Sequence, residues 1–317
     1  MSCSMESNEN KIGIVIHGGA GTILKENMTP ELENSYMIKL EEAVTAGYDI
    51  LKNGGSSKDA VEQAIRIMED SPLFNAGVGA VLTNDERVSL DASFMDGENL
   101  NAGAIAGSSY IKNPISAAIA VMDKSPHVLL SSKGADDFAI EMGIDTVPNS
   151  YFITERRLNS LRRLKDRNSV SFKDPFIKDS KFGTVGSVAI DINGNISAGT
   201  STGGTTNKIW GRIGDVPIIG AGNYANNECC GISATGWGEH FIRNVVAYDI
   251  AAQMIYKNEN IEEASKRSLD KVKATGGDGG VIGIDKNGNI AMEFNTAGMY
   301  RAHIDNEGNI TIKIYKD

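Results

Sequence analysis

A turn pattern that occurs three times in the second half of the chain limits the folds that this sequence can adopt. AIDINGNIS (189–197), GIDKNGNIA (283–291) and HIDNEGNIT (303–311) share the pattern Asp-x-x-Gly-Asn-Ile between two β-like stretches. Asp, Gly and Asn are the residues that tight hairpin turns favour, whereas an EF-hand calcium loop has another ligand order and helices on both sides. We therefore interpret the three Asp residues as turn residues and expect three hairpins.

The rest of the chain predicts helices and strands in an irregular order. A short apolar run ends in the Gly-rich turn HGGAG (17–21), and helical spacing follows. We expect strands at 12–16, 78–82, 87–92 and 102–108, and helices at 34–53, 57–69, 115–122, 133–142, 238–256 and 261–273. Neither half alternates strand and helix regularly, which disfavours a doubly wound parallel sheet. We expect an α+β protein in which helices pack outside stacked, mainly antiparallel sheets.

One charged segment interrupts this pattern. Residues 155–181 are rich in both charges and poor in aliphatic side chains. The front half predicts a solvated helix, and we interpret 168–183 as a mobile linker. The chain then enters a buried-looking strand abruptly through Gly183-Thr184. A solvated surface loop is the common reading of such a segment, and a processing site is the alternative.

Composition argues against several classes of partner. The 317 residues carry a formal net charge of −10, and nucleic acid binding needs a basic surface. No apolar run approaches the ~18 residues that cross a bilayer, and the polar start MSCSMESNENK lacks the apolar region of a secretory signal. Cys3 lies in this start and Cys229 adjoins Cys230, so no disulfide framework is indicated. We expect a cytoplasmic protein without nucleic acid or membrane partners.

Two Gly-rich motifs suggest other chemistry, but each needs a helix directly after it. IIGAGNYA (218–225) begins like a dinucleotide fingerprint, and the polar NNECCG follows it. GTSTG (199–203) places Ser201 as in a hydrolase nucleophile elbow, with Asp215 and His240 later in the chain. The segment after Ser201 is too polar and too Gly-rich for a helix. Neither motif is therefore our preferred interpretation.

Histidine and cysteine spacing gives no metal motif. Four histidines are scattered, without an HExxH pattern or a Cys-x-x-Cys pair: His17, His127, His240 and His303. We interpret each as an ordinary packed or surface histidine. No organic cofactor and no catalytic zinc or iron is expected.

A larger set of motifs resembles one family. The second half contains GTVG (183–186), TSTGG (200–204), NKIWGRIGD (207–215), GAGNYA (220–225) and TGWGE (235–239), and the first half contains HGGAG (17–21), FNAGVG (74–79), DASFMDG (91–97) and AGA (102–104). In this order, and over nearly the whole chain, the set resembles the plant-type asparaginase/isoaspartyl peptidase family of N-terminal nucleophile hydrolases. The resemblance implies one domain, 1–317, folded as a four-layer αββα sandwich.

The resemblance also gives the Gly183-Thr184 junction a chemical meaning. A Thr hydroxyl is a poor nucleophile unless a base lies beside it, and the α-amine of an N-terminal Thr has a pKa of about 7.7–8.0. The family frees that amine by attack of the Thr hydroxyl on the preceding carbonyl. Cleavage here would leave an alpha subunit, 1–183, and a beta subunit, 184–317. The resemblance further implies that two processed units pair.

Catalytic roles follow from the same resemblance, residue by residue. Thr184 is the nucleophile in both self-cleavage and amide hydrolysis, and Thr202 supports its hydroxyl and amine. Thr235 and the backbone of Gly236 form the oxyanion hole, in which one donor is typically worth ~2.7–4 kcal/mol.

Substrate-binding roles are implied as well. Arg212 binds the substrate α-carboxylate, and Asp215 with the backbone at Gly238 binds the α-ammonium. Asn75, Gly18 and Gly19 line the site. A structural sodium ion is implied on the backbone carbonyls of Met68, Glu69, Ser71, Phe74, Ala76 and Val78.

The expected substrates follow from the Arg and Asp pair. Together these side chains recognise a free amino acid head, so the amide that breaks is on the aspartyl side chain. This fits L-asparagine, which releases ammonia, and β-aspartyl (isoaspartyl) dipeptides, which release an amino acid. Trp237 either narrows the leaving-group side or packs at the rim, so the preference between the two substrates stays open.

Two alternatives remain. A glycosylasparaginase of the same superfamily resembles HDT at the cleavage point and STNG in the second motif, whereas this chain has FGT and STGG. A scaffold protein that kept the fold without processing is the alternative from another class.

Overall fold

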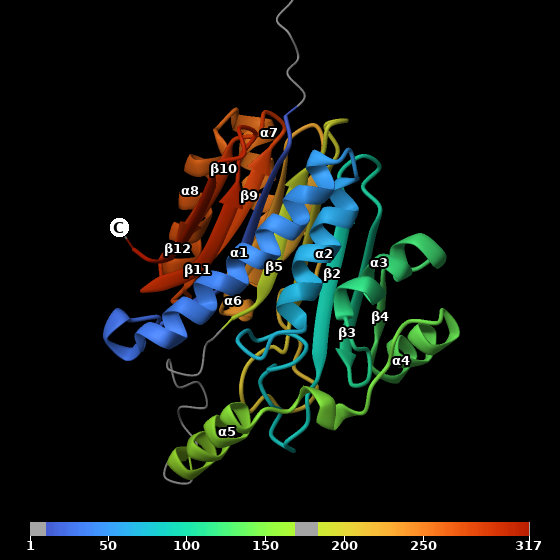
Figure 1. Ribbon diagram of the computed structural model, residues 1–317, viewed down its shortest axis with the longest axis vertical. Coiled ribbons are helices and arrows are strands. Elements are labelled where there is room, and N and C mark those ends of the chain that lie inside the picture. The colour runs from blue at the N-terminus through green and yellow to red at the C-terminus, as the bar shows by residue number, and fades with distance from the viewer. Residues whose placement is uncertain (1–10, 169–182, 317) are drawn as a thin grey trace, which may run out of the picture.

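Two β-sheets form the centre of the protein, as the computed structural model shows for residues 11–168 and 183–316 (Figure 1). The larger sheet has the strand order β12-β11-β1-β5-β6-β2-β3-β4, and the smaller has the order β10-β9-β8-β7. The bounds of the larger sheet's strands are β1 Gly13–Gly21, β2 Leu90–Asp96, β3 Ala102–Ser108, β4 Leu129–Ser131, β5 Val185–Ile190, β6 Ile196–Thr202, β11 Gly298–Ile304 and β12 Ile310–Tyr315. Those of the smaller sheet are β7 Asn223–Asn226, β8 Cys230–Gly236, β9 Gly279–Asp285 and β10 Ile290–Phe294. All pairings are antiparallel except β3 with β4.

Helices cover the outer faces of both sheets. Their bounds are α1 Pro30–Lys52, α2 Ser57–Glu69, α3 Pro114–Lys124, α4 Ser132–Glu141, α5 Glu155–Asn168, α6 Gly238–Asn244, α7 Val246–Lys257 and α8 Ile261–Ala274, with 3-10 turns η1 Lys25–Asn27 and η2 Asn149–Phe152. The apolar faces of α1 and α2 pack on the larger sheet, and those of α7 and α8 pack on the smaller one (Figure 1). The expected four-layer αββα sandwich is confirmed.

Strand β1 shows why the first apolar run is continuous. Ile14 and Ile16 belong to the core between the larger sheet and its helices, whereas Val15 belongs to the core between the two sheets. Successive side chains of a strand point to opposite faces, so a strand buried on both faces is apolar at every position.

The three expected hairpins are confirmed. They join β5 to β6, β9 to β10 and β11 to β12. In the first, the Asp191 carboxylate accepts the backbone N–H groups of Asn193 and Asn195, at 2.9 and 3.1 Å. Asp285 and Asp305 accept equivalent bonds in their own turns. Each carboxylate is therefore used by its turn.

Several element boundaries differ from the expectations. Strand β1 continues through HGGAG to Gly21, with an irregularity between His17 and Gly19 where it pairs with β11. No strand forms at 78–82, where Leu82 makes only a single bridge to Val88, and β2 begins at Leu90. Helix α1 begins earlier than expected because Thr29 caps it through the Leu32 N–H and Pro30 occupies its first turn.

The expected helix 238–256 is two helices. Val245 separates α6 from α7 with φ 48°, a left-handed conformation that is rare for a β-branched residue. The N–H groups of Ala247 and Tyr248 donate to the carbonyls of Ala221 and Gly220, at 3.2 and 2.8 Å. These contacts with a distant loop replace the hydrogen bonds that would continue α6.

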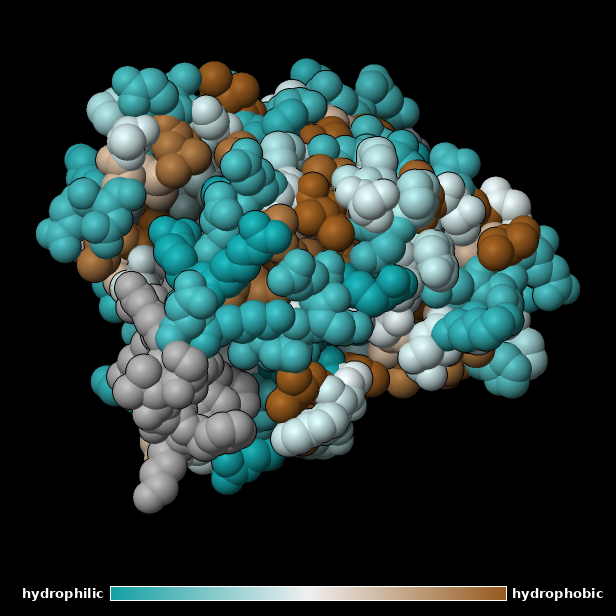
Figure 2. All heavy atoms as spheres, turned by 90° about the horizontal axis from the view of Figure 1, so that it is seen from below, coloured by the Kyte–Doolittle hydropathy of each residue, from teal (hydrophilic) through white to brown (hydrophobic). Residues whose placement is uncertain are grey.

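Helix α5 confirms the solvated helix expected in the charged segment. It lies at the lower end of the molecule in Figure 1, and Leu161 and Leu164 on its inner face are buried. From below, this end of the protein is largely hydrophilic, with apolar residues in small separate groups (Figure 2). The interpretation of 168–183 as a linker falls mostly on 169–182, which lie outside the described residues. None of the helices in the described part of the chain has the length and apolarity of a transmembrane segment.

Candidate active site

Thr184 lies at the centre of the larger sheet, directly before β5. Because Val185 pairs with Ser201 in the antiparallel β5–β6 ladder, the register places Thr184 opposite Thr202. The Thr184 hydroxyl donates to the Thr202 hydroxyl at 3.1 Å, and Thr202 Oγ1 also accepts the Gly204 N–H at 3.0 Å. Both side chains are buried. The structure therefore brings together the two Thr residues predicted as nucleophile and support.

Glycines surround the Gly183-Thr184 bond because other residues would not fit. A Cβ on Gly19 would lie 2.1 Å from the Cα of Gly183, and one on Gly18 would lie 2.4 Å from the Phe74 ring. Gly183 and Gly19 also have positive φ values of 79° and 110°, which favour glycine. HGGAG and Gly183 thus allow two backbones to touch at the bond that the sequence predicts to break.

His17 is a site residue that its sequence context led us to treat as ordinary. It is fully buried; Nδ1 lies 3.0 Å from the Thr184 carbonyl oxygen and Nε2 lies 3.0 Å from Ser233 Oγ. Burial lowers the pKa of His17 to about 3, so the ring is neutral. A carbonyl can only accept, so Nδ1 carries the hydrogen and Nε2 accepts from Ser233. His17 therefore fixes the backbone of Thr184. Its position in the HGGAG motif is the sequence feature that could have identified it as a site residue.

The predicted oxyanion-hole residues lie at the end of β8. Thr235 is buried, and its Oγ1 accepts the backbone N–H of Ala20 at 3.3 Å. This bond ties Thr235 to the end of β1 that touches Gly183. The hydroxyl hydrogen of Thr235 has no acceptor among the described residues and can donate to a ligand. Gly236 ends β8, where it pairs with Gly279 of β9.

Asn75 connects two walls of the site. Its Oδ1 accepts the Val81 N–H and its Nδ2 donates to the Gly204 carbonyl, both at 2.8 Å. A Cβ on Gly183 would lie 3.5 Å from the Asn75 backbone nitrogen. Asn75 therefore spans from the cleavage point to the loop after Thr202.

Arg212 is held by a carboxylate to which the sequence motifs assigned no role. Glu239 accepts from Arg212 Nε at 2.9 Å and from Arg212 Nη2 at 3.0 Å. This side-on pair uses two of the five guanidinium hydrogens, which leaves the Nη1 edge for another carboxylate. Glu239, the final residue of the TGWGE motif, therefore orients Arg212. No role was assigned to this acid from the sequence, although its place in the motif could have indicated one.

Asp215 lies beside Arg212 with one oxygen unused. It is 5% exposed, and its Oδ2 has no hydrogen-bond partner among the described residues. Burial raises the pKa of Asp215 to about 7, against the lowering effect of the Arg212 charge. A Cβ on Gly238 would lie 2.8 Å from Asp215 Oδ1 and 2.9 Å from Arg212 Nη2, so only glycine leaves this space open. We call Arg212, Asp215, Gly238 and Glu239 the head site.

Ser201 is placed away from this chemistry. It precedes Thr202 on β6 and points to the opposite face, where its hydroxyl donates to Glu69 Oε1 at 2.6 Å. Burial raises the pKa of Glu69 to about 8, opposed by the hydrogen bonds from Ser201 and Ile115. Turns follow GTSTG, and strand β7 follows IIGAG, so neither motif has the helix that its chemistry needs directly after it. The nucleophile-elbow and dinucleotide interpretations are not supported.

The segment predicted to hold sodium forms a closed loop at the end of α2. The Val78 N–H donates to the Glu69 carbonyl at 2.7 Å, which joins the two ends. Gly77 and Gly79 have positive φ values of 48° and 92°, which turn the backbone sharply. Side chains from outside the loop bind the carbonyls of Pro72, Leu73 and Gly79, which are not among the six predicted ligands. Of the six predicted carbonyls, those of Met68 and Glu69 accept the backbone N–H groups of Ser71 and Val78, at 3.3 and 2.7 Å.

Trp237 has a packing contact. Its ring lies edge-on to the His240 ring, with centroids 4.9 Å apart, and its backbone N–H donates to the Asp278 carbonyl at 2.9 Å. This contact agrees with the rim-packing alternative for Trp237.

Comparisons with known proteins all point to one family. A family model described as "Asparaginase" matches residues 10–314. An isoaspartyl peptidase of Escherichia coli is 47% identical over 296 residues, covering 92% of each chain. An isoaspartyl peptidase/L-asparaginase of Xenopus laevis is 41% identical over 296 residues, covering 93% of this chain and 92% of the relative. A Bos taurus protein of the same name is 39% identical over 287 residues, with coverages of 90% and 91%.

Proposed function

The chain belongs to the asparaginase family, and we propose that it is a self-processing threonine hydrolase of L-asparagine and β-aspartyl dipeptides. The observation that carries this proposal is the Thr184 hydroxyl, bonded to Thr202 and placed directly after Gly183. The names of the relatives also favour these substrates over those of a glycosylasparaginase.

Self-cleavage is the first step. Thr184 Oγ1 attacks the Gly183 carbonyl carbon, the C–N bond breaks, and the acyl group passes from nitrogen to oxygen. Water then hydrolyses the ester and leaves a carboxylate on Gly183 and a free amine on Thr184. Gly183 leaves its carbonyl accessible because it has no side chain, and His17 holds the backbone of Thr184 in place.

Substrate hydrolysis reuses the same hydroxyl. The new α-amine takes the hydroxyl proton as Oγ1 attacks the side-chain amide carbonyl of the substrate. Thr235 Oγ1 and the Gly236 backbone stabilise the oxyanion, while Thr202 orients the nucleophile. Ammonia or an amino acid leaves with the proton, and water releases aspartate from Thr184.

The head site selects the substrate. Arg212 binds the α-carboxylate through its Nη1 edge while Glu239 keeps the opposite edge fixed. Asp215 Oδ2 binds the α-ammonium, which supplies the hydrogen-bond donors that this buried oxygen lacks among the described residues. Both α groups must therefore be free, and the amide that breaks lies on the side chain.

The two products of self-cleavage remain one domain. Strand β1 from the alpha subunit, 1–183, pairs with β5 and β11 from the beta subunit, 184–317, and β2 pairs with β6. Separating the subunits would break the larger sheet at its centre. We therefore propose that they stay associated after cleavage.

Three further features are part of this proposal. A sodium ion is held by the carbonyls of the 68–78 loop in a structural role. Two processed units form a dimer, and a measurement of the molar mass in solution tests this. The protein works in the cytoplasm, where Cys229 and Cys230 stay reduced, and the location of a tagged chain tests this.

Substitution of the nucleophile tests the proposal. Wild-type protein incubated near neutral pH should give the fragments 1–183 and 184–317 by intact mass, with Thr at the new N-terminus. Thr184→Ala should stay a single chain and lose hydrolysis by at least about 10⁴-fold, because both steps need the hydroxyl. Thr184→Ser, which keeps a hydroxyl, should still be cleaved. A wild-type chain that stays intact and inactive for days would favour the scaffold alternative.

A further inference from the structure

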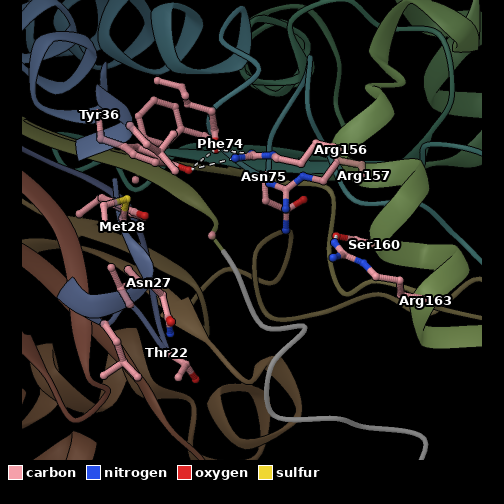
Figure 3. Close-up of a pocket in the computed structure, with 17 residues that line it drawn as sticks. Thr22, Asn27, Met28, Tyr36, Phe74, Asn75, Arg156, Arg157, Ser160 and Arg163 are labelled. Atoms are coloured by element: carbon pink, nitrogen blue, oxygen red, sulfur yellow. Dashed lines mark hydrogen bonds between the residues drawn. The ribbon is translucent and has the colours of Figure 1, made fainter. Parts of the chain in front are cut away.

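A hollow lies on the side of Gly183 that faces helix α5 (Figure 3). Its volume is about 400 Å³. Residues 18–36 and 73–75 form one side, α5 forms the other, and Gly183 and Tyr300 complete it. We call it the arginine hollow, after Arg156, Arg157 and Arg163.

The charge of the arginine hollow is opposite to that of the protein. Its described lining contains three arginines and no acidic residue, although the chain has a net charge of −10. Figure 3 shows Arg157 and Arg163 reaching from α5 toward Asn75, whereas Arg156 reaches across to Tyr36 and Phe74. Such a concentration of guanidinium groups favours an anion.

The three arginines differ in how many of their guanidinium groups' hydrogen bonds are already made within the protein. Arg156 donates to the carbonyls of Pro72 and Leu73, at 3.1 and 2.9 Å, and so serves mainly to hold the 73–75 wall. Arg157 is 8% exposed and uses Nε for the Gly79 carbonyl at 2.6 Å, and its terminal nitrogens have no acceptor among the described residues. Arg163 is exposed, and its side chain makes one long contact with the described residues, of 3.4 Å to Ser160. Arg157 and Arg163 are therefore the available donors.

Aromatic and aliphatic side chains make up most of the opposite wall, which also includes Thr22 and Asn27. Tyr36 and Tyr300 stack with centroids 4.1 Å apart, and Phe74 meets Tyr36 edge-on at 5.6 Å. Met28 and Leu32 continue this wall toward solvent. The hollow thus joins a cationic side to an apolar side, which suits an amino acid with a carboxylate and an apolar side chain.

The arginine hollow and the head site lie on different sides of the nucleophile. Gly183 lines the hollow, whereas Thr202, on the other side of Thr184, bonds to the Gly204 loop. A Cβ on Gly204 would lie 3.4 Å from Arg212 Nη1, so that loop leads to the head site. An aspartyl unit bound in the head site would present its scissile amide to Thr184, which leaves the Gly183 side for the group beyond that amide.

We propose that the arginine hollow binds the leaving amino acid of a β-aspartyl dipeptide, with Arg157 and Arg163 holding its free α-carboxylate and the apolar wall contacting its side chain. The inference rests on the proposed function and specifies its substrate class. Asparagine leaves only ammonia and does not reach the hollow, so the hollow distinguishes the two substrates.

Helix α5 is fixed well enough to serve as a binding wall. Leu161 is fully buried in a small core with Phe152, Leu82 and Leu90. The Arg157–Gly79 bond ties the helix to the loop that carries Asn75. These contacts do not involve Gly183, so they persist when the chain is cut there.

Steady-state kinetics of the processed enzyme test the proposal with three substrates: asparagine, β-aspartyl-leucine and β-aspartyl-leucinamide. Arg163→Met and Arg157→Met should each raise KM for β-aspartyl-leucine roughly tenfold, about 1.4 kcal/mol. In Arg163→Met the asparagine constants should stay within about twofold, because asparagine makes no contact with the hollow. The leucinamide, which lacks the carboxylate, should bind wild type weakly and be insensitive to both variants.

Matched controls distinguish loss of leaving-group binding from a general loss of charge or of folding. Arg162→Met removes a charge from an exposed neighbour outside the arginine hollow and should change none of the three substrates. Arg163 is exposed, so Arg163→Met should fold even if Arg157→Met, which removes a buried side chain, does not. Equal wild-type KM values for the acid and the amide would overturn the proposal. So would an Arg163→Met enzyme that is slower on asparagine and dipeptide alike, or in which only self-cleavage is altered. A wild type that hydrolyses none of the substrates would instead contradict the proposed function.

Discussion

The head site and the arginine hollow flank the same nucleophile but differ in charge, burial and origin. The head site pairs Arg212 and Glu239 with a nearby buried Asp215, and it comes entirely from the chain after Thr184. The arginine hollow combines cations with aromatic rings and comes almost entirely from the chain before Thr184. A site of mixed charge recognises a zwitterion, whereas a cationic site with an apolar wall recognises an anion with an apolar chain.

In the function that we propose, this difference assigns separate tasks to the two products of self-cleavage. The beta subunit would supply the nucleophile, Thr202, Thr235 and recognition of the aspartyl head. The alpha subunit would supply His17, Asn75 and the leaving-group side. Variants of the head site should therefore affect both substrates alike, whereas variants of the hollow should affect only dipeptides.

The largest effect on this comparison is expected from the head site. Arg212→Met should lower kcat/KM for asparagine and for β-aspartyl-leucine by the same factor, about 100-fold or about 3 kcal/mol, because a charge-assisted bidentate contact is lost. Parallel kinetics on the two substrates measure the factor. If only hydrolysis of the dipeptide became slower, Arg212 would bind the leaving group, and the roles that we propose for the two sites would have to be exchanged.

Asp215 should make the hydrolysis of both substrates depend on pH, which tests the head site separately from the arginine hollow. Its pKa is raised to about 7 by burial, and only the ionised carboxylate binds an ammonium group. Lowering the pH through about 7 protonates Asp215, so kcat/KM for both substrates should fall, by about tenfold between pH 8 and pH 6 for one such group. The amine of Thr184, which must be neutral to act as base, makes the fall steeper. In Asp215→Asn the residual activity should lose the inflection near 7, and an unchanged profile would assign that inflection elsewhere.

The smallest effect is expected from exchange of the cation. Replacing sodium by choline should loosen the 68–78 loop, which carries Asn75 and borders both sites. We expect a loss of roughly 1 kcal/mol of stability, about 2–4 °C in Tm, with a similar small decrease in kcat/KM for both substrates. Thermal melts at constant ionic strength measure this, with potassium as a size control. Identical melting in all three salts would argue against a sodium site.

Local sequence determined those features that depend on residues a few positions apart. The three Asp-x-x-Gly-Asn-Ile turns form as expected because each Asp binds amides two and four residues ahead. Helix α2 and strand β3 have the expected bounds, since their apolar spacing and end signals lie within the segment. The motif set indicated the family and, through it, the Thr184, Thr202 and Arg212 assignments.

Only the tertiary structure decided contacts between residues far apart in the chain. The pairs His17–Ser233 and Arg212–Glu239 are 216 and 27 residues apart, and no local pattern encodes them. The break at Val245 depends on carbonyls of another loop, and the arginine hollow exists because α5 lies against the loop that carries Asn75. The physical reason is that turns and helices are stabilised by neighbours in sequence, whereas a site between stacked sheets depends on which strands pair and in what register.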